Sequence, residues 1–275
     1  MAMEWVRDFY STTGEWWGAA EARITDRDHR RVDLLRRIAG DRSQRILELG
    51  CGYGATAAAM AQAGHTVTGV EISDRVAFAE QFVATAKPGR LSILQQDFYE
   101  TTLPEPVDAV FYWNGFGVGT DSDQRRLLHR ICTEWLRPDG IALIDIFNPF
   151  VWARWDGDDD SLEADPARGY RRDLSQHIEF SPVTCSATDT WWETGDPSRK
   201  ISQTLRCYTP ADLRLLLDGT GLRLDQLVVG DDMAGADHDF RSLLQDHYEY
   251  VAVLRPILSR PARGGSPATA DADSL

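Results

Sequence analysis

The sequence predicts an α/β protein built around an open, mostly parallel β-sheet with helices on both faces. Three observations carry this prediction. From residue 45 onward, short apolar runs alternate with helical segments, which is typical of a parallel sheet. The runs, such as 141–147, are apolar almost throughout, so both faces of these strands are expected to be buried. The first run leads into a glycine-rich turn and an alanine-rich helix.

The expected elements follow one another in a regular order. The first forty residues predict helices, with Trp5 and Phe9 on one face of the first and Val32 and Leu35 on one face of the second. Strands are then expected at 45–50, 66–71, 91–95, 107–114 and 140–147. Helices are expected between them at 54–63, 74–86 and 121–137, with the turn 137–140 before the fifth strand.

The pattern changes after Asn148 and Pro149. Residues 156–173 are acidic and polar, which predicts a loop. Residues 175–194 and 199–208 alternate like antiparallel strands, with a turn at Gly195, Asp196 and Pro197.

A return to the core is expected after this insertion. Thr209 and Pro210 are a cap residue and a first helical residue, and they predict a helix over 210–218. Strands are expected at 222–229 and 247–254. We therefore divide the chain into an N-terminal helical cap (1–42), a ligand-binding core (43–150), a largely β cap insertion (151–208), the C-terminal part of the core (209–258) and a disordered tail (259–275).

Composition narrows the class of partner. The 275 residues carry a net charge of −14, which disfavours nucleic acid and anionic membranes because both are polyanions. The four cysteines form no C-x-x-C pair, which indicates a reducing compartment, and no metal site is expected. The chain shows no signal peptide and no run of ~20 apolar residues. We expect a cytoplasmic protein that binds a small molecule, and we leave open whether it is a homodimer.

One turn carries the strongest functional signal. Glu48 ends a buried strand, and Gly50, Gly52 and Gly54 follow on alternate positions. Glycines leave the backbone uncovered, so a ligand can lie directly against it. Gly50 and Gly52 with Ala55 also fit the fingerprint of dinucleotide-binding turns. Glu48 decides between the two, since a carboxylate there would repel a pyrophosphate but suits a ligand with an ammonium and a sulfonium.

This turn resembles the first motif of the class I S-adenosylmethionine-dependent methyltransferases, E/D-x-G-x-G-x-G, and residues 48–54 match it at every fixed position. The order of elements is similar to that family over about 43–148 and 209–254. The resemblance implies a Rossmann-like seven-stranded methyltransferase sheet with an antiparallel last strand, an N-terminal helical segment and an antiparallel β cap insertion. The insertion and the residues around Arg206 look most like small-molecule methyltransferases of bacterial metabolism.

The cofactor implied by the resemblance is S-adenosylmethionine. Glu71 ends the second strand about twenty residues after the turn, the spacing at which an acid reaches a ribose diol. Asp97 and Phe98 end the third strand and suit the adenine, and Asn114 ends the fourth, near the methionine part. The predicted cofactor-binding residues are Tyr10, Trp17, Glu48, Gly50, Cys51, Gly52, Gly54, Glu71, Ile72, Asp97, Phe98 and Asn114. We interpret Cys51 as a small turn residue and not as a nucleophile.

The catalytic candidates rest on weaker signals. A sulfonium is already an activated methyl donor, so the enzyme mainly has to hold a nucleophile in line and exclude water. An oxygen nucleophile still benefits from a base, and histidine is the usual one near neutral pH. His29 and His177 fall in the predicted cap regions and are candidates, with packing or surface roles as the alternative. Arg206 and Tyr208 precede the helix after the insertion. Arg206 is a candidate clamp for a substrate carboxylate, with pairing to local acids as the alternative.

Three functional hypotheses follow. The first is methyl transfer to an oxygen or nitrogen atom of a small, partly apolar molecule, in secondary metabolism. The second keeps the cofactor but replaces methyl transfer with cyclisation, elimination or pericyclic chemistry on a natural-product intermediate. The third is a catalytically silent binding subunit, which the intact turn disfavours.

Overall fold

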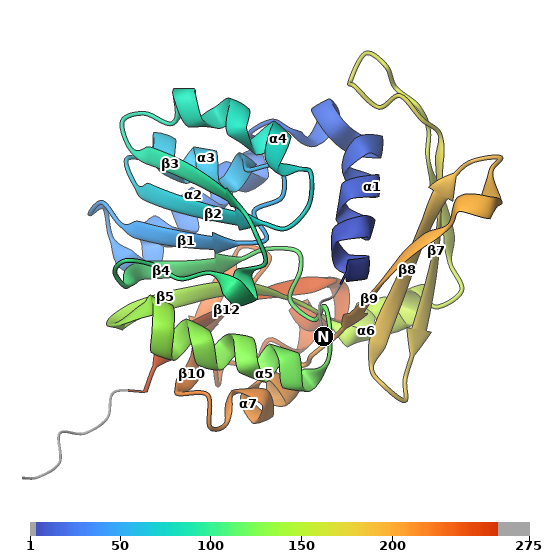
Figure 1. Cartoon of the computed structure of the whole chain (residues 1–275). Helices are drawn as coiled ribbons and strands as arrows, with labels where there is room; N and C mark the ends of the chain where they lie inside the picture. The colour runs from blue at the N-terminus through green and yellow to red at the C-terminus, as the bar shows by residue number, and fades with distance from the viewer. Residues whose placement is uncertain (1–3, 258–275) are drawn as a thin grey trace, which may run out of the picture.

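The chain folds around one large sheet, as the α/β prediction requires (Figure 1). The computed structural model describes residues 4–257. Eight strands lie in the order β11-β10-β12-β5-β4-β1-β2-β3. Strands β1 to β5 are parallel to one another, whereas β12 is antiparallel to both of its neighbours, β10 and β5. The strands are β1 (Arg45–Leu49), β2 (Thr66–Glu71), β3 (Arg90–Gln95), β4 (Val107–Tyr112), β5 (Leu136–Phe147), β10 (Leu222–Val229), β11 (Asp232–Gly235) and β12 (Glu249–Pro256).

The sheet has one strand more than the seven that were predicted. β11 is only four residues long and pairs antiparallel with the end of β10 at the edge of the sheet. None of its four residues is buried, so no apolar run marks it in the sequence.

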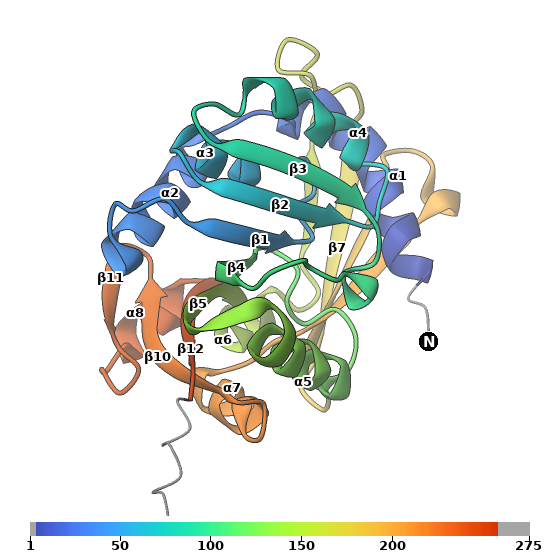
Figure 2. The ribbon, with the colours of Figure 1, turned by 60° about the vertical axis from the view of Figure 1, so that its left-hand side comes forward.

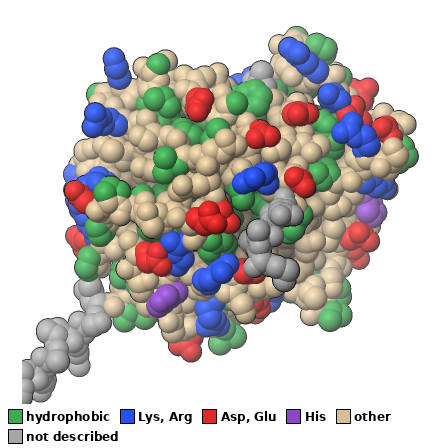
Figure 3. Space-filling view, in the orientation of Figure 1, with side chains coloured by type: hydrophobic (Ala, Val, Ile, Leu, Met, Phe, Trp, Pro, Cys, Tyr) green, Lys and Arg blue, Asp and Glu red, His purple; other side chains and the backbone are tan. Residues whose placement is uncertain are grey.

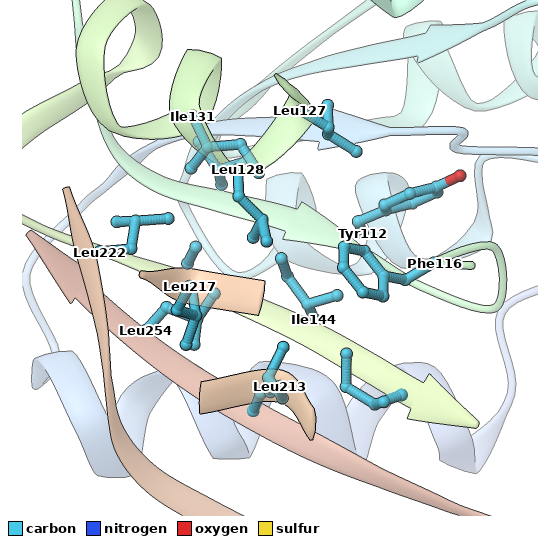
Figure 4. Close-up of a cluster of buried hydrophobic side chains, with 14 of the residues drawn as sticks. Tyr112, Phe116, Leu127, Leu128, Ile131, Ile144, Leu213, Leu217, Leu222 and Leu254 are labelled. Atoms are coloured by element: carbon cyan, nitrogen blue, oxygen red, sulfur yellow. The ribbon is translucent and has the colours of Figure 1, made fainter. Parts of the chain in front are cut away.

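Helices cover both faces of the sheet, which explains the continuous apolar strands. On one face, α2 (Asp26–Ala39) and α3 (Ala55–Gln62) pack against the strands through Leu35 and a row of buried alanines. On the other, α5 (Asp121–Arg130) and α7 (Pro210–Leu217) enclose a second cluster. Figure 4 shows Leu128 and Leu213 on opposite sides of Ile144 of β5 in that cluster. The remaining helices are short: α4 (Val76–Ala79), α6 (Pro149–Trp152) and α8 (Arg241–Asp246), and the single turns η1 (Glu80–Thr85), η2 (Phe98–Glu100), η3 (Ile131–Trp135), η4 (Ala153–Trp155) and η5 (Pro197–Arg199).

Two predicted helices have different ends from those expected. The segment 74–86 is α4 followed by the 3-10 turn η1. The segment 121–137 ends earlier, because α5 passes through a π-helical turn at η3 and β5 already begins at Leu136. The predicted turn 137–140 is a bulge at the start of β5: Leu136 pairs with Val107, and Ile141 pairs with Ala109.

The insertion forms a second, antiparallel sheet in the order β6-β7-β8-β9. Its strands are β6 (Asp159–Leu162), β7 (Leu174–Ser181), β8 (Ser186–Glu193) and β9 (Ile201–Arg206). The antiparallel strands agree with the sequence, but the loop predicted over 156–173 was partly wrong because it contains β6. Three of the four β6 residues are exposed at the edge of the sheet, so their polar side chains are compatible with a strand.

The helix α1 (Glu4–Glu21) stands between the two sheets (Figures 1 and 2). Its Trp17 ring meets Trp191 of β8 edge to face, with 5.2 Å between the ring centroids. Trp5 and Phe9 lie four residues apart in α1, as the predicted common face requires, but Phe9 is buried and Trp5 is exposed. The tail predicted over 259–275 lies outside the described residues.

Acidic and basic side chains are interspersed on the face shown in Figure 3, and neither kind forms a large patch there. Among residues 4–257, no helix combines the length and apolarity that a membrane span requires.

Candidate functional site

A cavity of about 610 Å³ lies where the carboxyl ends of the core strands meet α1, the start of α2 and the cap sheet. This is the place at which open α/β sheets bind their ligands. Eleven of the twelve residues predicted to bind the cofactor line it. They are Tyr10, Trp17, Glu48, Gly50, Cys51, Gly52, Glu71, Ile72, Asp97, Phe98 and Asn114.

Glu48 is the buried acid of this cavity. It is 3% exposed, and its Oε2 atom has no hydrogen-bond partner among the described residues. Burial raises the pKa of Glu48 to about 8, although the guanidinium of Arg31 opposes the shift. A buried carboxylate oxygen without a donor is costly. A ligand ammonium would supply that donor, so this residue fits the cationic end of the expected cofactor.

The glycines of the turn have two different functions. Gly52 has φ +53°, and a Cβ there would meet nothing closer than Arg75 Nη1 at 4.0 Å, so the space beside it belongs to the cavity. Gly54 is the predicted cofactor residue that does not line the cavity. A Cβ on Gly54, where φ is +77°, would lie 2.7 Å from Ala79 Cβ. Gly54 therefore allows α4 to pack closely against the turn.

Glu71 joins the turn to the end of β2. Its Oε2 accepts the backbone N–H of Gly52 at 2.8 Å, and its Oε1 accepts the backbone N–H of Ser73 at 2.8 Å and its hydroxyl at 2.6 Å. These bonds fix the carboxylate in one orientation. A carboxylate has about four acceptor positions, so one remains on Oε2 for a ligand hydroxyl, as the predicted contact to a ribose requires.

The end of β3 supplies the other predicted contacts. Asp97 accepts the backbone N–H of Tyr99 at 2.8 Å and caps the turn η2. Phe98 and Ile72 line the cavity beside it and offer apolar surface to a flat ring. Cys51 is buried, and burial raises the pKa of its thiol, which agrees with a small turn residue and not with a nucleophile.

Asn114 has an uncommon backbone conformation, with φ +57°. Asparagine tolerates this region better than most residues. Its backbone N–H donates to Asp145 Oδ1 at 2.5 Å, and this bond holds the chain as it leaves β4. Burial raises the pKa of Asp145 to about 7, with a further contribution from Glu249.

Arg31 is a functional candidate that sequence reasoning missed. Its guanidinium lines the cavity, donates to Thr56 Oγ1 at 2.9 Å and lies 3.4 Å from Asp145 Oδ2, with Trp113 4.4 Å below it. Thr56 in turn donates to Asp28, which belongs to the capping box of α2. An arginine has five N–H donors, so several stay available for an anionic group in the cavity. The capping box predicts where α2 begins, but nothing in the sequence indicates that Arg31 is buried.

Arg75 is a second residue that was missed. Its Nε donates to the Tyr10 carbonyl at 2.9 Å and its Nη2 to Thr13 Oγ1 at 2.7 Å. The guanidinium also lies 5.0 Å from the Tyr10 ring centroid and 4.8 Å from that of Tyr53. Arg75 therefore ties α1 to the loop after β2 and closes one wall of the cavity.

The four catalytic candidates are placed elsewhere. His29 lines a separate surface pocket, and His177 lies on β7, where its Nδ1 is 2.8 Å from Asp159. Arg206 and Tyr208 both contact Asp121, at 3.1 Å and 2.8 Å. None of the chain's six histidines is among the residues that line the cavity. The geometry thus gives these candidates no access to a ligand in the cavity.

Comparison with known proteins identifies the core. Residues 46–140 match the family model described as a methyltransferase domain. This part of the chain is therefore similar to a methyltransferase domain. Two curated proteins, both named as candidate methyltransferases, share this region. The one from Geobacillus sp. (strain WCH70) is 29% identical over 118 residues, which is 42% of this chain and 47% of that protein. YqeM of Bacillus subtilis (strain 168) is 33% identical over 113 residues, which is 38% and 43%. The match thus spans less than half the length of either relative.

Solved structures extend the likeness to the whole fold. The CcbJ methyltransferase of Streptomyces caelestis superposes with a TM-score of 0.70 at 20% identity, over 92% of this chain and 98% of that one. CalS10, an amino pentose methyltransferase of Micromonospora echinaspora solved with S-adenosylmethionine bound, gives 0.57 at 18% identity, over 90% and 96%. At these identities the likeness shows the fold. The predicted fold class is confirmed, the match over residues 46–140 agrees with the predicted family, and the comparisons support S-adenosylmethionine as the cofactor.

Proposed function

We propose that the protein is an S-adenosylmethionine-dependent methyltransferase that methylates an oxygen or nitrogen atom of a small molecule in natural-product biosynthesis. The observation that carries the proposal is that one cavity holds both a Glu48 oxygen without a partner among the described residues and the guanidinium of Arg31, whose side chain is 13% exposed. An α-amino acid end presents an ammonium and a carboxylate together, and these two side chains match it. CalS10 and the sugar N-methyltransferase KedS8 are similar in fold and act on sugars, which favours a small-molecule substrate.

The residues at the ends of β2 and β3 would make the remaining contacts to the cofactor. Glu71 would accept from the ribose, and Asp97, Phe98 and Ile72 would surround the adenine. The bound cofactor supplies a methyl group that is already activated. The residues of this chain therefore have to bind it, orient it and keep water away from the reacting atoms.

The methyl acceptor would occupy the side of the cavity that faces the cap. Leu162 and Trp191 of the cap sheet, together with Trp17 of α1, line that side. Aromatic and aliphatic side chains there suit a partly apolar acceptor. Since no histidine lines the cavity, we expect positioning to contribute more to the rate than base catalysis.

The test has two parts. Calorimetry should show that S-adenosylmethionine and S-adenosylhomocysteine bind the full chain. Incubation with methyl-labelled S-adenosylmethionine and a panel of amino sugars, phenols and amines should then give a labelled product and an equal amount of S-adenosylhomocysteine. Binding without any S-adenosylhomocysteine formed, but with a changed acceptor, would instead indicate non-methylating chemistry. No binding of either nucleoside would refute the proposal.

The role of Arg31 can be separated from general damage. Arg31→Gln should weaken S-adenosylhomocysteine by about tenfold, a typical coupling for one charged contact. The same variant should leave 5′-methylthioadenosine unaffected, because that probe lacks the amino acid end. Arg30→Gln, on an exposed residue of the same helix that does not line the cavity, is the matched control. Equal losses for both probes would mean that Arg31 only supports the fold.

A further inference from the structure

A buried carboxylate in the cap sheet has no part in the function described so far. Asp189 lies on β8 and is 6% exposed. Burying a carboxylate is costly unless its oxygens accept hydrogen bonds. Gln176 of β7 donates to Oδ1 at 2.7 Å, and Gln203 of β9 donates to Oδ2 at 3.0 Å. Each oxygen of Asp189 therefore accepts one hydrogen bond from a side-chain amide.

These bonds fix the direction of a third one. An ionised carboxylate only accepts, so the amide nitrogen of Gln203 has to face Asp189. Its Oε1 is then turned toward α1, where it accepts from the Tyr10 hydroxyl at 3.0 Å. A tyrosine hydroxyl has a single hydrogen. Because that hydrogen is directed at Gln203, Tyr10 can only accept hydrogen bonds on the side that lines the cavity.

Two further features keep the Tyr10 ring in one position and its hydroxyl protonated. Arg75 donates to the Tyr10 backbone carbonyl and lies over its ring, so the ring has a fixed position. Burial raises the pKa of Tyr10, and the carboxylates of Glu71 and Asp189 add to the shift against the opposing effect of Arg75. The hydroxyl therefore stays protonated near neutral pH and is not a base.

We propose that Asp189 is a positioning residue that acts through Gln203 and makes the Tyr10 oxygen a fixed acceptor for an N–H or O–H group of the methyl acceptor. The site then selects a protic amine or alcohol over a fully substituted nitrogen or a carbon nucleophile. The inference rests on the proposed function, since it places the acceptor in the cap side of the same cavity. It narrows the substrate class to molecules that carry a hydrogen on the group bound at Tyr10.

The first test reads the Tyr10 hydroxyl directly. The chain has eight tyrosines, and with a ¹³Cζ tyrosine label the Tyr10 resonance is identified by its loss in Tyr10→Phe. In the complex with S-adenosylhomocysteine, Gln203→Leu and Asp189→Leu should both move this resonance. The double variant Asp189→Asn with Gln176→Glu should restore it, because the carboxylate introduced at position 176 would take the new amide nitrogen and leave the amide oxygen facing Gln203. Thr190→Val, which removes a hydroxyl contact to Ser202 from the next residue of β8, is the control and should not move it.

The second test measures the selection. Indole carries an N–H donor, and 1-methylindole is a probe of nearly the same shape without one. We expect the wild-type complex to prefer indole by roughly three- to tenfold, the effect of one hydrogen bond. The preference should fall to about one in Tyr10→Phe, Gln203→Leu and Asp189→Leu, and it should return in the double variant. Equal affinities in the wild type, or a Tyr10 resonance that does not respond to Asp189→Leu, would overturn the inference.

These outcomes are independent of the test of the proposed function. If S-adenosylhomocysteine does not bind the wild type, the proposed function fails first. If it binds and the Tyr10 resonance is unchanged in every variant, only the positioning role of Asp189 is lost.

Discussion

The two sides of the cavity are built in different ways. On the strand-end side, Glu71 and Asp97 each accept a backbone N–H from two residues further along the chain, and Glu71 also accepts that of Gly52 in the glycine turn. On the cap side, side chains of α1 are held by side chains from far along the chain, as in Tyr10 with Gln203 and Trp17 with Trp191. Backbone contacts do not change when nearby side chains are substituted, whereas side-chain contacts do.

The difference in how the two sides are held suits the strand-end side to binding the cofactor and the cap side to selecting the methyl acceptor. The strand-end side suits a ligand that is always the same, such as a cofactor. The cap side can change its specificity by substitution without disturbing the sheet. Substitutions on the two sides should therefore affect different measurements, and four predictions test the comparison.

The largest effect is expected at Glu71. Glu71→Ala removes the acceptor for the ribose and leaves the N–H of Gly52 and that of Ser73 without their partner. Losing the charge-assisted bond to the ribose, together with the two backbone bonds that hold the turn in shape, should weaken S-adenosylhomocysteine by on the order of 100-fold. Calorimetry measures it, with Asp74→Ala, an exposed acid of the same loop, as the control. An affinity within about threefold of the wild type would show that the turn does not recognise the nucleoside.

Glu48 should have the next largest effect, on stability. Its pKa in the folded protein is raised to about 8 from an ordinary value of 4.5. The folded state therefore binds a proton that the unfolded state has released. The contribution is fully present below pH 4.5 and is lost as the pH rises through 8. The ligand-free protein should thus lose on the order of a few kcal/mol between pH 5 and pH 8 from this residue.

The measurement is a set of thermal or urea unfolding curves between pH 5 and pH 8. Glu48→Gln should be more stable than the wild type at pH 8 and should depend less on pH, because its amide cannot ionise. It should nevertheless bind S-adenosylhomocysteine less tightly. Asp145, whose pKa burial also raises, remains in both proteins and contributes a slope of the same sign. Identical pH slopes in the two proteins would contradict the assignment of Glu48 as a buried, partnerless acid.

The same contrast explains what the sequence could predict. The strand-end residues follow local rules, because each one ends a strand and the carboxyl ends of neighbouring parallel strands share one edge of the sheet. Glu48, Glu71, Asp97 and Asn114 were found in this way, and all four line the cavity. The seven core strands were found from a local pattern too, the alternation of short apolar runs with helical segments.

The residues that were missed or misplaced depend on distant partners. Arg31 is held at the cavity beside Asp145, which lies 114 residues away in the sequence. Arg206 was a candidate clamp for a substrate carboxylate, with pairing to an acid as the alternative. In the structure it pairs with Asp121, which lies 85 residues away in the sequence. His29 lies on α2, the helix that also carries Arg31, yet it opens onto a separate pocket. A sequence does not state which distant side chains will meet, so such contacts need the folded structure.

A smaller effect is expected from the two glycines of the turn. Gly52→Ala and Gly54→Ala both place an L-residue in the left-handed region, at roughly 1–2 kcal/mol each. Gly54→Ala should lose about 1–3 kcal/mol more in unfolding free energy, because its Cβ would clash with Ala79. Gly52→Ala should instead lose more ligand affinity, because its Cβ would point into the cavity. Urea unfolding and calorimetry on both variants test this, and a reversed order would mean that the ligand lies against Gly54.

The smallest effect is expected at Tyr208, behind the cap side. Tyr208 is 1% exposed, and its hydroxyl donates to Asp121 at 2.8 Å. Tyr208→Phe removes that single bond, while Asp121 keeps Arg206 and water as partners, so about 1 kcal/mol of stability should be lost. For a chain of this size that corresponds to a fall in Tm of about 2–4 °C.

Affinity for S-adenosylhomocysteine and the rate of methyl transfer should stay within about twofold of the wild type in Tyr208→Phe. Tyr10→Phe is the comparison variant, and it should change the binding of a protic probe. If Tyr208→Phe instead lowered the rate more than tenfold at an unchanged Tm, the hydroxyl would have to reach the reacting atoms, and the cap would have to rearrange to bring it there.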